Sequence, residues 1–126
     1  MSKPTREDAA LMLQFAQWAN GAVQNKAYPY VWGDDFIADF DEFTQKHSRG
    51  SKENGYISQL LSVYETLGTL YKLGLFNEEL LFEWQAIYPI WDRLESHALG
   101  RRKESGDPRI MENFEFMAKK ARERKP

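Results

Sequence analysis

The sequence predicts an all-α protein, a bundle of about five helices in a single domain that covers residues 1–126. Apolar residues recur at spacings of three and four along most of the chain, which is the period of a helix with one buried face. No stretch alternates apolar and polar residues for long enough to predict a pair of strands. A chain of this length buries enough surface to fold without disulfides or a metal, so one domain is expected.

The first predicted helix begins after Thr5, an N-cap residue that is followed by Glu7 and Asp8. Acidic residues in a first turn are favoured by the helix dipole. The apolar face consists of Leu11, Phe15, Trp18 and Ala22. We expect this helix to end near residues 24–26.

An aromatic connector and a second helix are expected next. Residues 28–33 read YPYVWG, and a proline biases the residue before it towards extended backbone. Asp34 or Asp35 is expected to cap the second helix. Its apolar face consists of Phe36, Phe40 and Phe43. Residues 48–55 contain no large apolar side chain and predict a mobile loop.

The third predicted helix covers residues 56–73 and is the most apolar in the chain. Its polar positions form a single narrow stripe of Ser58, Ser62, Glu65, Thr69 and Lys72. Since only this stripe can face water, the helix is expected to be central. Gly74 can end it in the left-handed conformation. Gly68 lies in its interior, where a glycine is unfavourable unless it permits close packing of another helix.

The fourth predicted helix follows a short connection, with Asn77 as its N-cap. Such a short connection makes the third and fourth helices antiparallel neighbours, a central helical hairpin. Pro89 lies within the fourth helix. The apolar pattern of residues 80–98 continues through it, and Tyr88 is a poor N-cap for a new helix. The sequence therefore predicts one helix kinked at the proline.

The last predicted helix begins at Asp107 and Pro108, a cap residue followed by proline. Its apolar face consists of Ile110, Phe114, Met117 and Ala121. Residues 119–126 predict a frayed basic tail. Residues 101–126 hold nine basic and five acidic residues, whereas the rest of the chain is acidic. Since an acidic body repels backbone phosphates, nucleic-acid binding is not expected.

Residues 64–80, YETLGTLYKLGLFNEEL, resemble a family of uncharacterised bacterial all-helical domains. The shared pattern is an aromatic–Glu pair, a glycine one turn later, Lys-x-Gly-Leu, and then acids and a leucine. Later matches are Trp91-Asp92-Arg93-Leu94, Arg101, Pro108 and Phe114-Glu115. The resemblance covers roughly residues 56–118 and implies a helical fold, and it brings no established activity with it. Some similar domains follow a membrane segment, which this sequence lacks.

Several kinds of chemistry find no support in the sequence. There is no cysteine, so thiol chemistry and disulfides are excluded and a reducing, cytoplasmic location is expected. No apolar run approaches the length of a membrane span, and the N-terminus does not read as a signal peptide. His47 and His97 have no carboxylate at helical contact spacing, so we expect no metal site and place both at the surface or at helix ends. No nucleophile or phosphate-loop motif is found, so no catalytic residue and no cofactor are expected.

Two functional hypotheses remain. The first is a non-enzymatic helical module that binds another protein or a second copy of itself, because several aromatic residues lie outside the apolar stripes. These residues are Tyr28, Tyr30, Trp32 and Phe82. The alternative is a site for a small apolar ligand, or an enzyme site, in an aromatic pocket beside Pro89. Its candidate lining is Tyr64, Trp84, Gln85, Tyr88 and Trp91.

Ion pairs are also expected between helices. Glu65 and Glu115 each follow an aromatic residue on a polar stripe, and Arg93 is their candidate partner. We interpret such pairs as structural. The sequence leaves open whether residues 1–55 pack onto residues 56–118 or serve a partner.

Overall fold

A computed structural model describes residues 3–124, apart from the side chains of residues 22–25, and within this range the chain forms six α-helices and no strand. The all-helical class is confirmed, and the expected count of about five helices is wrong. The helices are α1 (Arg6–Trp32), α2 (Phe40–Lys46), α3 (Lys52–Lys72), α4 (Glu78–Trp84), α5 (Ile87–Ser105) and α6 (Glu112–Glu123).

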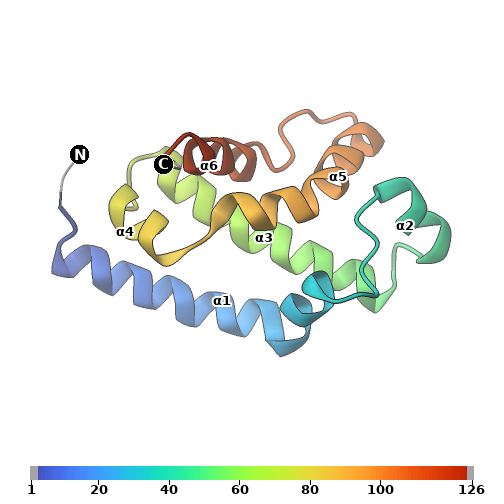
Figure 1. Cartoon of the computed structure of the whole chain (residues 1–126), viewed down its shortest axis with the longest axis horizontal. Helices are drawn as coiled ribbons and strands as arrows, with labels where there is room; N and C mark the ends of the chain where they lie inside the picture. Colours follow the sequence, from blue (N-terminus) through green and yellow to red (C-terminus); the bar gives the residue numbers. More distant parts are fainter. Residues whose placement is uncertain (1–2, 125–126) are drawn as a thin grey trace.

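Helix α3 crosses the middle of the molecule, with α1 along one side of it and α6 along the other (Figure 1). Helix α5 packs on α6, and α2 packs on α5. The centre of the bundle is therefore α3 between α1 and α6, and not a hairpin of α3 with the helix that follows it. Both α1 and α2 pack onto the later part of the chain, which is one of the two possibilities that the sequence leaves open for residues 1–55.

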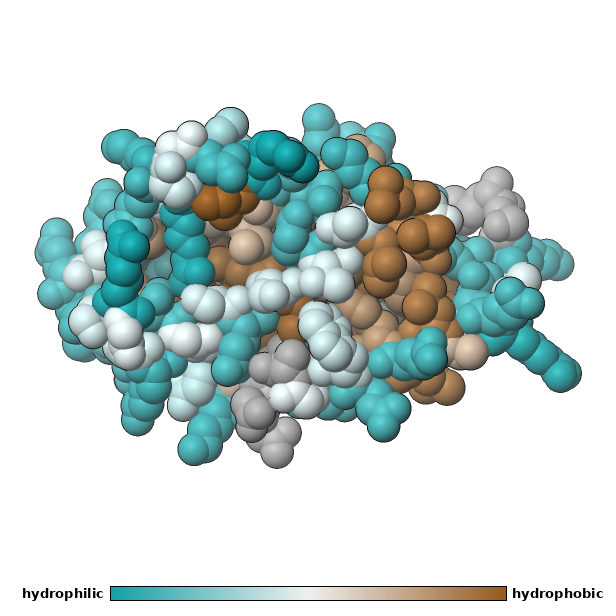
Figure 2. Space-filling view, turned by 180° about the vertical axis from the view of Figure 1, so that it is seen from behind, coloured by the Kyte–Doolittle hydropathy of each residue, from teal (hydrophilic) through white to brown (hydrophobic). Residues whose placement is uncertain are grey.

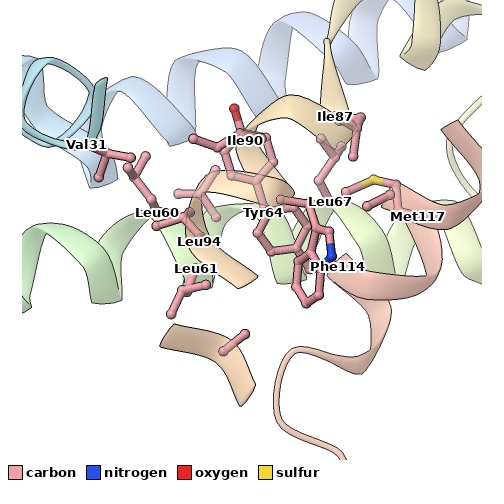
Figure 3. Close-up of a cluster of buried hydrophobic side chains, with 14 of the residues drawn as sticks. Val31, Leu60, Leu61, Tyr64, Leu67, Ile87, Ile90, Leu94, Phe114 and Met117 are labelled. Carbon is pink, nitrogen blue, oxygen red and sulfur yellow. The ribbon is translucent and has the colours of Figure 1, made fainter. Parts of the chain in front are cut away.

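All six helices contribute buried apolar side chains to the core. Figure 3 shows a part of it in which residues of α3, α5 and α6 lie near Val31 of α1. Fully buried residues include Leu60, Leu61, Leu67, Ile90, Leu94, Phe114 and Met117. Helix α3 lies close against the start of α6 at Gly68, where an added Cβ would lie 2.4 Å from the carbonyl oxygen of Asn113. The expected reason for this glycine, close helix packing, is confirmed.

Helix α1 begins as expected and ends later. Thr5 caps it, and Thr5 and Asp8 each bond the other's backbone N–H in a capping box. The helix continues through Pro29 to Trp32, so the predicted connector at residues 28–33 is wrong. An interior proline costs about 3 kcal/mol. The burial of Ala27 and Val31, which lie four residues apart on the inner face, stabilises these last turns.

The next two helices begin where short polar side chains can cap them. Asp39, and not a residue at position 34 or 35, accepts the backbone N–H of Glu42 and starts α2. Ser51 accepts the backbone N–H of Asn54 and starts α3. The second half of the predicted loop at residues 48–55 is therefore helical.

The predicted kinked helix is two separate helices. Gln85, with φ −120° and ψ 133°, has extended backbone between α4 and α5. Pro89 is the third residue of α5, in the first turn, where backbone N–H groups have no partner within the helix. The extended residue also removes the clash that the proline ring would have with the preceding helical turn. The prediction failed because the chain breaks before the proline and not at it.

The last two helices are also displaced from their predicted positions. Helix α5 reaches Ser105 and ends at Gly106, which has a left-handed φ of 74°. Helix α6 begins at Glu112, after a turn, and not at Pro108. It continues to Glu123, so much of the segment that was expected to fray is helical, and residues 125–126 lie outside the described range.

Candidate functional site

A cavity of about 380 Å³ lies between α1, α3 and the junction of α4 and α5. Three of the five predicted pocket residues line it, namely Tyr64, Trp84 and Gln85. The wall contributed by α1 was not anticipated and consists of Phe15, Ala16, Ala19, Asn20 and Tyr28. Because Tyr28 was assigned to a connector, its position on the inner face of α1 could not be expected.

A chain of polar side chains crosses this cavity. The hydroxyl oxygens of Tyr28 and Tyr64 are 2.7 Å apart. The Tyr64 hydroxyl donates to Oε1 of Gln85 over 3.4 Å, a long hydrogen bond, which leaves Tyr28 as the donor to Tyr64. Gln85 can take part because it lies in the extended junction, where its side chain reaches the end of Tyr64.

Both phenol groups stay protonated at neutral pH. Burial raises the pKa of Tyr64 far above that of an ordinary tyrosine, and the neighbouring Tyr28 raises it further. Burial also raises the pKa of Tyr28, and the hydrogen bond to Tyr64 offsets part of this effect. The pair can therefore orient a bound polar atom, but it offers no base for proton abstraction.

The remaining wall of the cavity is aromatic. Trp84 stacks on Phe76 with ring centroids 6.1 Å apart, and it meets the edge of Phe15 at 6.2 Å. Phe15 also contacts Phe76 at 6.5 Å. These rings connect α1 to α4, so the pocket wall is also part of the packing that holds the short helix in place.

The other two predicted pocket residues lie elsewhere. Trp91 is buried and meets the edge of Phe114 at 4.9 Å, within the core. The ring of Tyr88 lies beneath the guanidinium of Arg122, 4.9 Å away. Both follow the α4–α5 junction, and the break there turns them away from the face that carries Trp84.

The structure pairs the predicted ionic residues differently. Arg93 donates to the carbonyl oxygens of Val31 at 2.6 Å and Gly33 at 3.0 Å. Its guanidinium also lies over Phe36, 5.0 Å from the ring centroid. Arg93 thus satisfies the carbonyl groups at the end of α1, and among the described residues its guanidinium forms no ion pair with Glu65 or Glu115.

The two glutamates have separate roles. Glu115 forms an ion pair with Arg102 at 2.8 Å. Glu65 accepts the backbone N–H groups of Asn113 and Phe114, at 3.0 and 2.8 Å. Burial raises the pKa of the Glu65 carboxyl, and these two backbone donors lower it in part. The N-cap residue of α6, Met111, makes no side-chain hydrogen bond to the first turn of that helix. Glu65 therefore serves as the cap of α6, from another helix.

The outer face of α1 carries no charge over most of its length. Residues 9–25 contain no Asp, Glu, Lys or Arg. The exposed positions described in this stretch include Ala10, Leu13, Gln14, Gln17, Trp18 and Asn20. Leu13 is 64% exposed and Trp18 is 47% exposed, although Trp18 was expected on the inner face.

A second exposed apolar region adjoins the start of α4. Leu73 and Leu75 flank Gly74 in the turn between α3 and α4, and both are exposed. Figure 2 shows hydrophobic side chains gathered at this end of the molecule, over the α3–α4 turn and the first half of α1. We call Leu13, Trp18, Leu73 and Leu75 the apolar patch.

Neither a metal centre nor a membrane segment is found in the described part of the chain. No group of three or more His, Asp or Glu side chains between residues 3 and 124 could hold a metal ion. In the same range, no helix combines the length and the apolar character needed to cross a membrane.

A family model described as "Domain of unknown function (DUF4760)" matches residues 4–121. The expected resemblance to an uncharacterised helical domain family is confirmed, and the match includes the helices before residue 56. No curated protein and no solved structure matches the chain.

Proposed function

Because the chain belongs to DUF4760, a family of domains of unknown function, we propose a role from its surface: a single, non-enzymatic helical module that associates with a second copy of itself. The observation that supports this proposal is the charge-free outer face of α1, with Leu13 and Trp18 exposed on it.

A charge-free face suits a contact between identical chains. In a two-fold interface the same surface is used by both copies, so a charged residue near the axis would meet a like charge. The exposed positions of α1 recur at spacings of three and four, as a second helix lying along this face requires. Leu73 and Leu75 extend the apolar surface at one end, and exposed apolar surface of this kind is typical of protein interfaces.

Sedimentation equilibrium over a wide range of protein concentration tests the proposal. The unmodified chain is expected to form dimers. Leu13→Glu and Trp18→Glu are each expected to weaken dimerisation at least about tenfold, because the new carboxylate would be buried in the interface near the same carboxylate of the second chain. Leu99→Glu is the matched control, since Leu99 is an exposed leucine on α5 outside the apolar patch. A monomer at every accessible concentration, or equal weakening by Leu99→Glu, would overturn the proposal.

The cavity beside Tyr64 favours a second candidate function, the binding of a small, mostly apolar molecule. Its volume is within the range of ligand pockets, and it combines aromatic walls with a few polar atoms. Tyr28, Tyr64 and Gln85 would orient a single polar group of the ligand.

A filling variant tests this second candidate. In a thermal-shift screen of aromatic alcohols and amides, ligands that stabilise the unmodified chain are expected to lose their effect in Ala19→Leu, since Ala19 lines the cavity. Ala10→Leu adds the same atoms on the exposed face of the same helix and is the control. If no compound stabilises the unmodified chain, or if Ala19→Leu responds as fully as Ala10→Leu, the cavity is not a ligand site.

A further inference from the structure

Arg101 holds a partly buried positive charge near the end of α5. Its Nη1 donates to Oγ of Ser58 and its Nη2 donates to Oδ1 of Asn54, both over 2.9 Å. Within the described residues, no carboxylate lies within 4.0 Å of the guanidinium, so its only partners are neutral. A buried charge is normally paired, because removal of an ion from water is unfavourable.

The surroundings of Arg101 oppose its charge. Burial lowers the pKa of the guanidinium, and the nearby cation of Arg49 lowers it further, while Glu104 acts in the opposite direction. Glu104 is itself engaged, since it accepts from Nη2 of Arg49 at 3.1 Å. Arg49 and Arg101 therefore have one nearby carboxylate between them, that of Glu104, so this part of the surface carries an excess of positive charge.

A cavity of about 540 Å³ opens beside these side chains. It lies between the end of α2, the start of α3 and the end of α5, at the opposite end of the molecule from the α3–α4 turn (Figure 1). Arg49, Arg101 and Glu104 line it together with the apolar side chains of Phe40 and Ile110. A volume of this size can hold a ligand much larger than a single ion.

The guanidinium groups retain the donors that an oxyanion needs. An arginine side chain has five N–H donors in a planar fork, and the hydrogen bonds of Arg101 to Ser58 and Asn54 use only two of them. Arg49 is highly exposed, and an exposed ion pair contributes at most about 1 kcal/mol. Arg49 can therefore exchange Glu104 for a ligand at little cost, while the neutral bonds to Ser58 and Asn54 hold Arg101 in place.

We propose that this cavity binds a small organic oxyanion, a phosphate or carboxylate group joined to an apolar body. Arg101 anchors the oxyanion, Arg49 supplies the second guanidinium, and Phe40 and Ile110 contact the apolar part. The site is independent of the self-association proposed above, because it uses no residue of the apolar patch.

Isothermal titration of the full chain with phenyl phosphate, benzoate and benzyl alcohol at fixed ionic strength tests this site. At least one of the two anions is expected to bind and to raise the melting temperature, whereas the neutral alcohol is not. Binding of phenyl phosphate alone assigns the phosphate class, and binding of benzoate alone assigns the carboxylate class. Failure of both anions to bind at millimolar concentration, or equal binding of the alcohol, would overturn the proposal.

Variants locate the binding. Arg101→Gln keeps an amide that can bond Ser58 or Asn54 and is expected to weaken anion binding at least about tenfold, as the loss of a charge-assisted hydrogen bond does. Arg49→Gln removes an exposed charge, so it provides a folded variant if Arg101→Gln does not fold, and it is expected to weaken binding severalfold. Arg122→Gln removes the same charge from α6, where Arg122 pairs with Asp92, and should leave binding unchanged. Unchanged affinity in Arg49→Gln and Arg101→Gln, or equal loss in Arg122→Gln, contradicts the site.

Discussion

At the scale of single residues, His97 differs most from its sequence-based prediction. It was placed at the surface or at a helix end, and it is fully buried. Its Nε2 lies 2.9 Å from the carbonyl oxygen of Ile37, and its Nδ1 is buried without a hydrogen-bond partner among the described residues. The rings of Phe36, Phe40 and Phe43 surround it. The segment before α2 folds over α5, and no local pattern around His97 predicts that contact.

The burial of His97 predicts a loss of stability in mild acid. Burial lowers the pKa of His97 from 6.5, and the hydrogen bond to Ile37 offsets part of this effect. Below pH 6.5 the imidazole of His97 binds a proton more readily in the unfolded chain than in the folded chain. The contribution of His97 to the free energy of unfolding is therefore complete above pH 6.5 and is lost as the pH falls below that value. Urea unfolding at pH 7, 6 and 5 measures this effect. The free energy of unfolding should fall by up to about 1.4 kcal/mol for each pH unit, and His97→Phe should reduce this slope.

Histidine 47 provides the comparison for this measurement. His47→Phe retains the buried imidazole of His97, so the pH dependence should stay steeper in this variant than in His97→Phe. An equal change in both variants would mean that the buried imidazole is not the source of the pH dependence.

At the scale of helices, α6 depends on a cap from another helix. Its N-cap residue is Met111, which has a positive φ of 59° and provides no side-chain acceptor. Glu65 of α3 supplies that acceptor for the second and third residues of α6, Asn113 and Phe114. These are the donors that a local Ser, Thr or Asp normally satisfies. The start of α6 is thus tied to the middle of α3.

Removal of this cap should destabilise the fold without changing its helix order. Glu65→Ala is expected to lower the free energy of unfolding by about 1–2 kcal/mol, as loss of an N-cap does. Glu65→Gln retains an acceptor oxygen and should lose less. Urea denaturation followed by circular dichroism measures both, and an equal loss in the two variants would argue against capping.

The contact between α3 and α6 gives a second prediction at this scale. Gly68→Ala places a methyl group against the backbone of Asn113 and is expected to cost about 1–3 kcal/mol, the usual range for overpacking. Gly55→Ala is the control in the same helix, because no atom lies within 4 Å of the added methyl group. It should stabilise the chain by about 0.5–1 kcal/mol through helix propensity. Thermal or urea unfolding that gave both variants the same sign would contradict this account of the packing.

At the scale of the whole molecule, the two proposed surfaces lie at opposite ends. Self-association through uncharged groups predicts that added salt does not weaken the dimer, since screening acts only on charges. The melting temperature should also rise with protein concentration, because a dimer that forms only from folded chains stabilises them. Differential scanning calorimetry at two concentrations and two salt levels tests both effects, with Leu13→Glu as the variant that should lose the concentration dependence. A dimer that dissociates at high salt would place charged residues in the interface.

The limits of sequence-based prediction are clearest in the helix boundaries. Thr5 and Asn77 were predicted as caps and are caps, because a cap is a contact over three residues. Pro29 was expected to lie in a connector and Pro89 to kink a helix, yet the first lies inside α1 and the second in the first turn of α5. A proline in the sequence shows where a helix lacks one backbone N–H donor. Whether the helix ends there depends on what burial of the neighbouring turns contributes.

The candidate pocket was also predicted only in part from the sequence. Tyr64, Trp84 and Gln85 were predicted together and line one cavity, while Tyr88 and Trp91 point elsewhere because the chain breaks before them. The sequence by itself determined the helical class, the apolar faces and the absence of cysteine, since these depend on composition and on spacings within one or two turns. Only the tertiary structure decided that Glu65 caps α6, that His97 is buried and that Arg101 faces a cavity. Each of these depends on contacts between residues more than forty positions apart, and no local spacing encodes them.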